Sequence, residues 1–365
     1  AGQAPARLAL AAIAAQPRRA ASAVIPVAMA VAMVGSVYFA DASIQHATVT
    51  QAASTVTADH VISGADLTPA TLREVQALPG VHAAAGVTPV SVAVTDPDLD
   101  QAYGEAVTGG PLSQLLDLGV TSGSTAAPRP GQVAVSALEA GSGALGVHAG
   151  STITVYLPDG TPYRATVSAI YDRSLASGDL LIPASVAAGH TGTPAGYSQI
   201  LVSGGTPAGL ARLAASHPGL RVVSRAVANA QSAQAIAQNS FANNLILGVL
   251  AALSAVALIN TLVVTTLERR RVLRLLGRVG ATRGQVAAVF GWQVVFIVGT
   301  GLIAGAGAGV VTLLAVTRAV TGSWTPFIPL VPALGLVAVI AVLAAGAVMI
   351  PFGVMSRREP TLAAG

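Results

Sequence analysis

The stretch Leu267–Phe290, LERRRVLRLLGRVGATRGQVAAVF, places six arginines between two long apolar segments. The chain has 365 residues but only 19 basic ones, and every one of these is Arg. Only 9% of its residues are charged and 53% are hydrophobic, whereas soluble domains carry roughly 25% charged residues. This composition predicts a membrane protein in which the basic stretch marks one side of the bilayer.

Four segments approach or exceed the roughly 20 apolar residues that cross a bilayer as a helix. They are Ala21–Ala40, Asn244–Leu267, Val286–Val316 and Ile328–Val354. The first could also be a secretory signal peptide, because it has a basic start and an Ala-x-Ala-like end. Its long apolar core and the even number of spans favour an uncleaved helix.

The arginines predict the orientation of these spans. Arg7, Arg18 and Arg19 precede the first span, six arginines lie between the second and third, and Arg357 and Arg358 follow the fourth. Positive residues concentrate on the cytoplasmic side. We therefore expect a multi-pass protein of the cell (plasma or inner) membrane, with both termini in the cytoplasm and a large extracytoplasmic domain after the first span.

The extracytoplasmic region contains a weak internal repeat. Residues 60–90 and 198–227 both alternate as strand, helix and strand, with Thr-Pro at the helix start and Pro-Gly after its end. Thr at the N-cap, Pro at the first helical position and Gly after the helix are the residues that these boundaries favour. Two such units predict a split βαβ lobe with helices on one side of the sheet.

A β-rich insertion, about 105–185, separates the two repeats. Within STITVYLPDGTPYRATVSAIYD (151–172), apolar and polar residues alternate on both sides of Pro158-Asp159-Gly160, which predicts a β-hairpin. GQVAVS (131–136) and DLLIP (179–183) read as further strands. The fold class is therefore a membrane α-helical protein with an extracytoplasmic α+β domain of two lobes.

Residues 226–271 contain no Pro and predict one helix of about 45 residues, or roughly 65 Å. The hydrocarbon core takes only about 30 Å of that length, so the remainder would form an outer stalk. Its face of Ala230, Ala233, Ala237 and Phe241 is expected to pack on an extension of the first span, residues 41–54.

The arginine-rich loop itself has two interpretations. The simpler one is topological, with the arginines only fixing the spans on either side. The order of the residues favours a role in binding a partner as well. Apolar residues continue the helix after the arginines until Gly280 breaks it, and Thr282 with Gln285 has the spacing of a capping box. A short amphipathic helix ending in a tight corner suits insertion into a cleft on a cytoplasmic partner.

With these motifs in order, the sequence resembles the FtsX/MacB-type ABC transporter permeases. An arginine run after Glu, an apolar turn, a Val-Gly-Ala-Thr corner and a Gly-rich third span follow one another in that family, although Val272 stands where a second Glu is common. The resemblance implies a coupling loop that docks on a separate ATPase. The implied docking residues are Glu268, Arg269, Arg270, Arg271, Arg274, Gly280, Ala281 and Thr282.

Two features of the spans predict helix packing. Gly301, Gly305 and Gly309 form a small-xxx-small row, which lets helices approach closely. Asn260 is a polar residue near the middle of the second span, where an unpaired amide is costly, so we expect an interhelical hydrogen bond.

Catalytic and cofactor sites are not expected in this chain. There is no Cys for a thiolate site and no Lys for a phosphate-binding P-loop or a Schiff base. The six His show no metal-ligand spacing, and 4% aromatic residues are too few for nucleic-acid stacking. In this interpretation the chain is not an enzyme, has no metal or cofactor of its own, and leaves ATP to a partner subunit.

The sequence thus predicts a permease subunit that couples a partner's ATP hydrolysis to movement of the extracytoplasmic domain, for export, lipoprotein handling or mechanotransmission. The alternative is a membrane-anchored sensor or scaffold without an ATPase. The chain would act as a homodimer, or as the C-terminal half of a ten-span permease, with an extracytoplasmic protein as a further partner. The expected boundaries are 1–20 interfacial segment, 21–42 first span, 43–232 extracytoplasmic domain, 233–267 stalk and second span, 268–285 coupling loop, 286–316 third span, 317–327 outer loop, 328–354 fourth span and 355–365 cytoplasmic tail.

Overall fold

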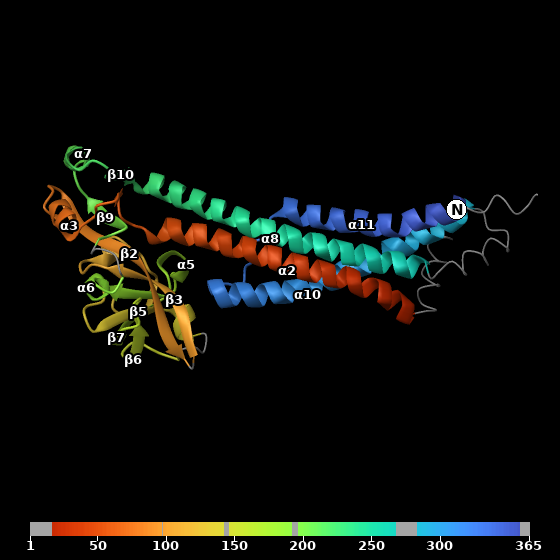
Figure 1. Cartoon of the computed structure of the whole chain (residues 1–365), viewed down its shortest axis with the longest axis horizontal. Coiled ribbons are helices and arrows are strands. Elements are labelled where there is room, and N and C mark those ends of the chain that lie inside the picture. Colours follow the sequence, from red (N-terminus) through yellow and green to blue (C-terminus); the bar gives the residue numbers. More distant parts are fainter. Residues whose placement is uncertain (1–16, 97, 142–145, 192–195, 268–282, 358–365) are drawn as a thin grey trace, which may run out of the picture. The chain divides into compact units, whose positions relative to one another are not determined.

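The computed structural model describes residues 17–96, 98–141, 146–191, 196–267 and 283–357 (Figure 1). The chain divides into two units. The helical unit comprises Ala1–Ser43, Ser240–Arg318 and Ser323–Gly365. The sheet unit comprises Ile44–Asn239 and Ala319–Gly322.

Long helices dominate the helical unit. They are α2 (Pro17–Thr55), α8 (Arg225–Leu267), α10 (Arg283–Thr321) and α11 (Leu330–Arg357), and the first two continue into the residues of the sheet unit. The prediction of one uninterrupted helix after the second repeat is confirmed, since α8 runs for 43 residues. No Pro or other strong breaker interrupts this segment, so the backbone hydrogen bonds can continue throughout.

The helices of this unit share one buried core. Val27 and Val31 of α2 meet Val294 and Val298 of α10 and Ile340 of α11, and all five are buried. Many large apolar side chains of these helices are exposed in the single chain, for example Met29, Leu245 and Val331.

Among the described residues, two helical stretches are long and apolar enough to cross a membrane. They are Val24–Thr55 and Gly291–Thr321, while Asn244–Ala257 and Leu330–Leu343 are shorter apolar stretches. The count of four spans and the orientation of the termini stay predictions.

The sheet unit contains one mixed sheet, built in the described residues from ten strands. Its order is β10-β1-β9-β2-β3-β8-β5-β7-β4, with β6 pairing with β2 and β7. The strands are β1 (His60–Ser63), β2 (Val81–Asp96), β3 (Asp98–Val107), β4 (Val120–Gly123), β5 (Gln132–Ser136), β6 (Thr152–Tyr156), β7 (Pro162–Tyr171), β8 (Leu180–Pro183), β9 (Gln199–Gly204) and β10 (Arg221–Ser224). The helices between them are α3 (Pro69–Gln76), η1 (Leu112–Gln114), α4 (Ala137–Gly141), α5 (Ser174–Ser177), α6 (Ala184–Ala187) and α7 (Pro207–Ser216).

The predicted repeat forms one end of this sheet. Strands β10, β1, β9 and β2 lie in this order, each antiparallel to its neighbour. Helices α3 and α7 bury Leu72, Val75, Leu210 and Leu213 in a common core with these strands. Both helix starts use the predicted N-cap, since Thr68 accepts from the backbone N–H of Thr71 and Thr206 from that of Gly209. Each following Pro occupies the first helical turn, where its missing N–H has no partner to lose.

The predicted hairpin at the other end is also confirmed. Strands β6 and β7 pair in antiparallel register from Thr152↔Thr166 to Tyr156↔Pro162. Gly160 takes the left-handed conformation (φ +82°) that the turn needs, and the N–H of Thr161 donates to Asp159 Oδ1 at 3.0 Å.

The two predicted lobes are not separate sheets. The long strand β2 pairs with β9 through Val81–Val87 and with β3 from Val87 to Asp96, so a single strand joins both ends. Each end still has its own hydrophobic core, with a third core between them around Tyr171. The alternation of apolar residues shows that each segment is a strand but carries no information on which strands pair.

The predicted contact face of the outer part of α8 is largely exposed to solvent in the single chain. Ala230 and Ala237 are exposed and Ala233 is half-buried, while the side chain of Phe241 lies outside the described residues. The small Ala and Gln side chains offer little apolar area to drive packing on α2.

Candidate functional site

The arginine-rich loop joins α8, which ends at Leu267, to α10, which begins at Arg283. The eight predicted docking residues, Glu268 to Thr282, lie outside the described residues, so their placement stays a prediction.

The glycine row of α10 lies against α2. A Cβ added at Gly301 would come within 2.7 Å of Val27 Cβ, and one at Gly305 within 2.5 Å of the carbonyl oxygen of Ala28. At Gly309 the nearest atom, Ala32 Cα, would be 3.6 Å away. The two backbones therefore approach so closely that only glycine fits at the first two positions.

Asn260, for which an interhelical hydrogen bond was predicted, lies on an exposed face of α8 in the single chain. Its side chain is exposed on α8, with no hydrogen bond to other described residues of the chain. It continues a row of exposed apolar residues, Ile246, Val249, Leu253 and Val256, whose exposed fractions are 62–68%. The spacing of three and four residues along this row is that of a helix–helix seam.

The last turn of α2 is fixed to the sheet unit through backbone hydrogen bonds. The N–H of Asp117 donates to the carbonyl oxygen of Thr55 at 2.7 Å, and the N–H of Thr57 donates to that of Leu115 at 3.0 Å. The first of these bonds occupies a carbonyl group that the end of α2 leaves without an intrahelical partner. We call this contact, formed by residues 53–58 with 115–117 and Arg173, the α2 anchor.

Arg173 completes the α2 anchor. Its Nη1 donates to the carbonyl oxygens of Ser54 (3.1 Å) and Asp117 (3.0 Å) and forms an ion pair with Asp117 Oδ2 at 2.8 Å. A cation at a helix C-terminus also interacts favourably with the helix dipole. The sequence did not predict the role of Arg173, because a lone Arg in a loop 119 residues from Ser54 lies in no local motif that indicates the contact.

Three buried oxygens near the same helix end have no hydrogen-bond partner among the described residues. They are Oε1 of Gln51, Oγ1 of Thr55 and Oγ1 of Thr57. An unpaired buried polar atom lowers the stability of the folded protein by about 1–3 kcal/mol. The hydrogen bonding of buried oxygens is therefore less complete at this end of α2 than in the rest of the described sheet unit.

The first turn of α8 is fixed nearby within the same unit. The N–H of Arg225 donates to the carbonyl oxygen of Asp59 at 3.0 Å, and Asn229 Nδ2 donates to that of Ala53 at 3.4 Å. The end of α2 and the start of α8 are thus joined to each other as well as to the sheet.

Two carboxyl groups of the sheet unit have strongly shifted pKa values. Burial raises the pKa of Glu105 to about 8, and Glu105 in turn contributes, after burial, to the raised pKa of Tyr171. The hydrogen bond from His190 at 2.7 Å, with that from Thr161, lowers the pKa of Asp159 to about 2. Among the described residues, no group of three or more His, Asp or Glu side chains is arranged to hold a metal ion.

One family model matches the chain. Residues 244–360 match the model described as FtsX-like permease C-terminal. This part of the chain is similar to the C-terminal domain of FtsX-like permeases. The matched residues include the stretch Leu267–Phe290, so the family prediction made from that stretch is confirmed. The FtsX-like permease domain covers most of α8, the loop, α10 and α11.

The chain is similar to three solved structures of domains from other proteins. The periplasmic region of MacB from Actinobacillus actinomycetemcomitans has 10% identity and a TM-score of 0.38, over 49% of this chain and 94% of that one. The extracellular domain of the noncanonic ABC-type transporter YknZ from Gram-positive bacteria has 13% identity and a TM-score of 0.36, over 46% and 98%. A domain of a permease protein from Porphyromonas gingivalis has 13% identity and a TM-score of 0.33, over 47% and 89%. No curated protein has a significant match to the sequence.

Proposed function

We propose that this chain is the membrane subunit of an ABC transporter complex whose ATPase is a separate polypeptide. The observation that carries the proposal is the FtsX-like permease domain, which encloses the six-arginine stretch between α8 and α10. The absence of Lys in the chain supports it further, because a phosphate-binding P-loop needs that residue.

In this proposal residues 268–285 form a coupling loop on the cytoplasmic side, four spans cross the membrane, and the sheet unit is extracytoplasmic. ATP-driven movement of the loop would reach the sheet unit through α2 and α8. Both helices are continuous, and within the sheet unit their ends are held by Arg173, Arg225 and Asn229. A rigid helix that is fixed at its outer end can transmit a displacement of its inner end.

The test is a triple change of Arg269, Arg270 and Arg271 to Ala in the complex reconstituted in lipid. We expect the ATPase to dissociate from the variant or to lose its stimulation by the permease. The double variant R357A/R358A is the control, because it removes cytoplasmic arginines without changing the loop. Full ATPase binding and stimulation in the triple variant would exclude docking through these arginines. Failure of any ATPase to purify with the unchanged chain would instead favour the sensor or scaffold function.

We further propose that two copies, or two halves of a longer permease, pair through α8. Asn260 supports this, because an exposed amide within an apolar helix is costly in lipid and would be satisfied across a seam. The chain has no Cys, so an introduced Asn260→Cys would be the sole thiol. Oxidation should link this variant into dimers, whereas Ile303→Cys, exposed on α10, should stay monomeric. Equal linking of both would contradict pairing through α8.

A further inference from the structure

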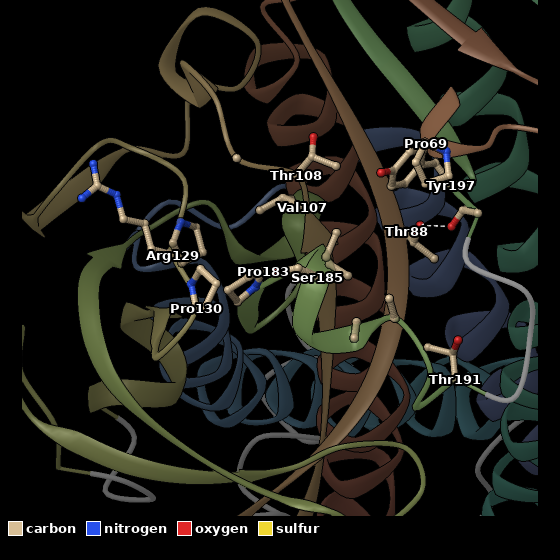
Figure 2. A pocket seen from close by; sticks show the side chains of 17 residues that line it. Pro69, Thr88, Val107, Thr108, Arg129, Pro130, Pro183, Ser185, Thr191 and Tyr197 are labelled. Carbon is tan, nitrogen blue, oxygen red and sulfur yellow. Dashed lines mark hydrogen bonds between the residues drawn. The ribbon is translucent and has the colours of Figure 1, made fainter. Parts of the chain in front are cut away.

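The sheet unit contains a cavity of about 410 Å³ (Figure 2). Its walls come from segments far apart in the sequence, including the start of α3, the ends of β3 and β8, the start of α6 and the loop at residues 128–130. Pockets that bind small ligands typically have volumes of about 300–1,000 Å³, so this cavity has the size of a ligand site.

The walls are mostly apolar and poor in hydrogen-bond donors. Four prolines line the cavity, together with small apolar side chains such as those of Ala106 and Val107. Proline has no backbone N–H, so these parts of the wall cannot donate to a ligand. The prolines are Pro69, Pro128, Pro130 and Pro183.

Few polar groups in the lining are available to a ligand. The hydroxyl of Thr88 donates to the carbonyl oxygen of Gly196 at 3.0 Å, and that of Thr108 accepts from the N–H of Gly86 at 2.9 Å. The hydroxyls of Ser185 and Tyr197 make no hydrogen bond with other described residues. Burial raises the pKa of Tyr197, so its hydroxyl stays protonated and able to donate at neutral pH.

Arg129 is the one charged side chain among the described residues that line the cavity. It is exposed, and its guanidinium forms no ion pair within the described parts of the chain. Figure 2 shows it beside Pro130 at the edge of the cavity, with Tyr197 toward the opposite side. The lining therefore combines an apolar wall with a single cation at its rim.

We infer that this cavity binds a small amphipathic carboxylate, with the apolar part against the proline wall and the acid paired with Arg129. A planar guanidinium binds a carboxylate through two parallel hydrogen bonds, which makes one Arg sufficient for a singly charged acid. The side chain must turn toward the ligand from the position in Figure 2, which its exposure allows. This inference does not depend on the proposed coupling to an ATPase.

The shared chemistry has two natural sources, a short fatty acid and the C-terminus of an apolar peptide. The experiment uses the full chain in lipid nanodiscs, with isothermal titration calorimetry and empty nanodiscs as the blank. The probes are decanoate and acetyl-trileucine, each compared with its neutral counterpart, decanol and acetyl-trileucine amide. Binding of one acid identifies its source, and binding of both supports the shared chemistry.

We expect Arg129→Gln to weaken binding of the acids at least tenfold and to leave the neutral counterparts unchanged. Arg164→Gln is the matched control, because it removes an exposed Arg of β7 outside the lining. Ala188→Trp, which fills the cavity from an exposed lining position, should abolish binding of every probe. The inference is overturned if neither acid binds above the blank, or if Arg129→Gln and Ala188→Trp both leave the affinities unchanged.

Discussion

Thr55 and Thr71 are both buried, but among the described residues only the hydroxyl of Thr71 forms a hydrogen bond. Thr71 Oγ1 donates to the carbonyl oxygen of Asp66 at 3.3 Å and lies 3.1 Å from Thr68 Oγ1. Thr55 Oγ1, by contrast, has no hydrogen-bond partner in the described part of the chain. Thr55→Val should therefore raise the free energy of unfolding by about 1 kcal/mol, and Thr71→Val should lower it by about 1–2 kcal/mol. Urea denaturation of both variants measures the difference. A loss of stability in Thr55→Val would show that its hydroxyl has a partner in the folded protein.

The carboxyl of Glu105 should make the stability of the sheet unit depend on pH. Its pKa is about 8 when folded and 4.5 as the unperturbed value, so between these pH values only the folded state holds the proton. The free energy of unfolding should thus fall as pH rises from about 4.5 to about 8, by up to about 1.4 kcal/mol per pH unit.

Glu105→Gln should remove this dependence and stabilise the protein at pH 8. Hydrogen exchange of β3 and β7 at pH 5 and pH 8, corrected for intrinsic rates, provides the measurement. Asp66→Asn, which removes an exposed carboxylate of the same unit, is the control for the loss of one charge. An unchanged pH dependence in Glu105→Gln would assign the effect to another group.

The contact between α2 and α10 gives a direct test of helix packing. Gly305→Ala would place a Cβ 2.5 Å from the carbonyl oxygen of Ala28 and force the helices apart, which typically costs about 1–3 kcal/mol. Gly307→Ala is a matched control, because a Cβ there meets nothing within 4 Å and gains helix propensity. Thermal unfolding in detergent should show a lower Tm for the first variant only. Equal Tm values would mean that the two helices do not touch at Gly305.

The ends of α2 and α8 depend on contacts that no local pattern indicates. The predicted N-caps at Thr68 and Thr206 follow from residues within three positions of each other, and the structure contains both. The ion pair of Arg173 and Asp117, by contrast, joins residues whose neighbours give no hint of an interaction. Element boundaries were therefore accessible from sequence, whereas the α2 anchor was not.

For the chain as a whole, the absence of Cys allows its orientation to be measured one position at a time. Thr161→Cys lies in the exposed turn of the β6–β7 hairpin, and Arg278→Cys lies in the predicted coupling loop. A membrane-impermeant maleimide should label the first in intact cells and the second only in inverted vesicles. Labelling of Arg278→Cys from outside would reverse the proposed orientation and remove the basis for ATPase docking.

By itself, the sequence determined the class of protein, the long helices, the repeat with its caps, the hairpin and the family of its C-terminal part. Each of these depends on hydrophobic length, periodicity or residues close together in the chain, which act before any tertiary contact forms. The tertiary structure decided the strand order, the packing of Gly301 and Gly305 against α2, the α2 anchor and the cavity beside Arg129. These depend on which distant segments meet, because a buried pattern shows that a face is covered but not what covers it.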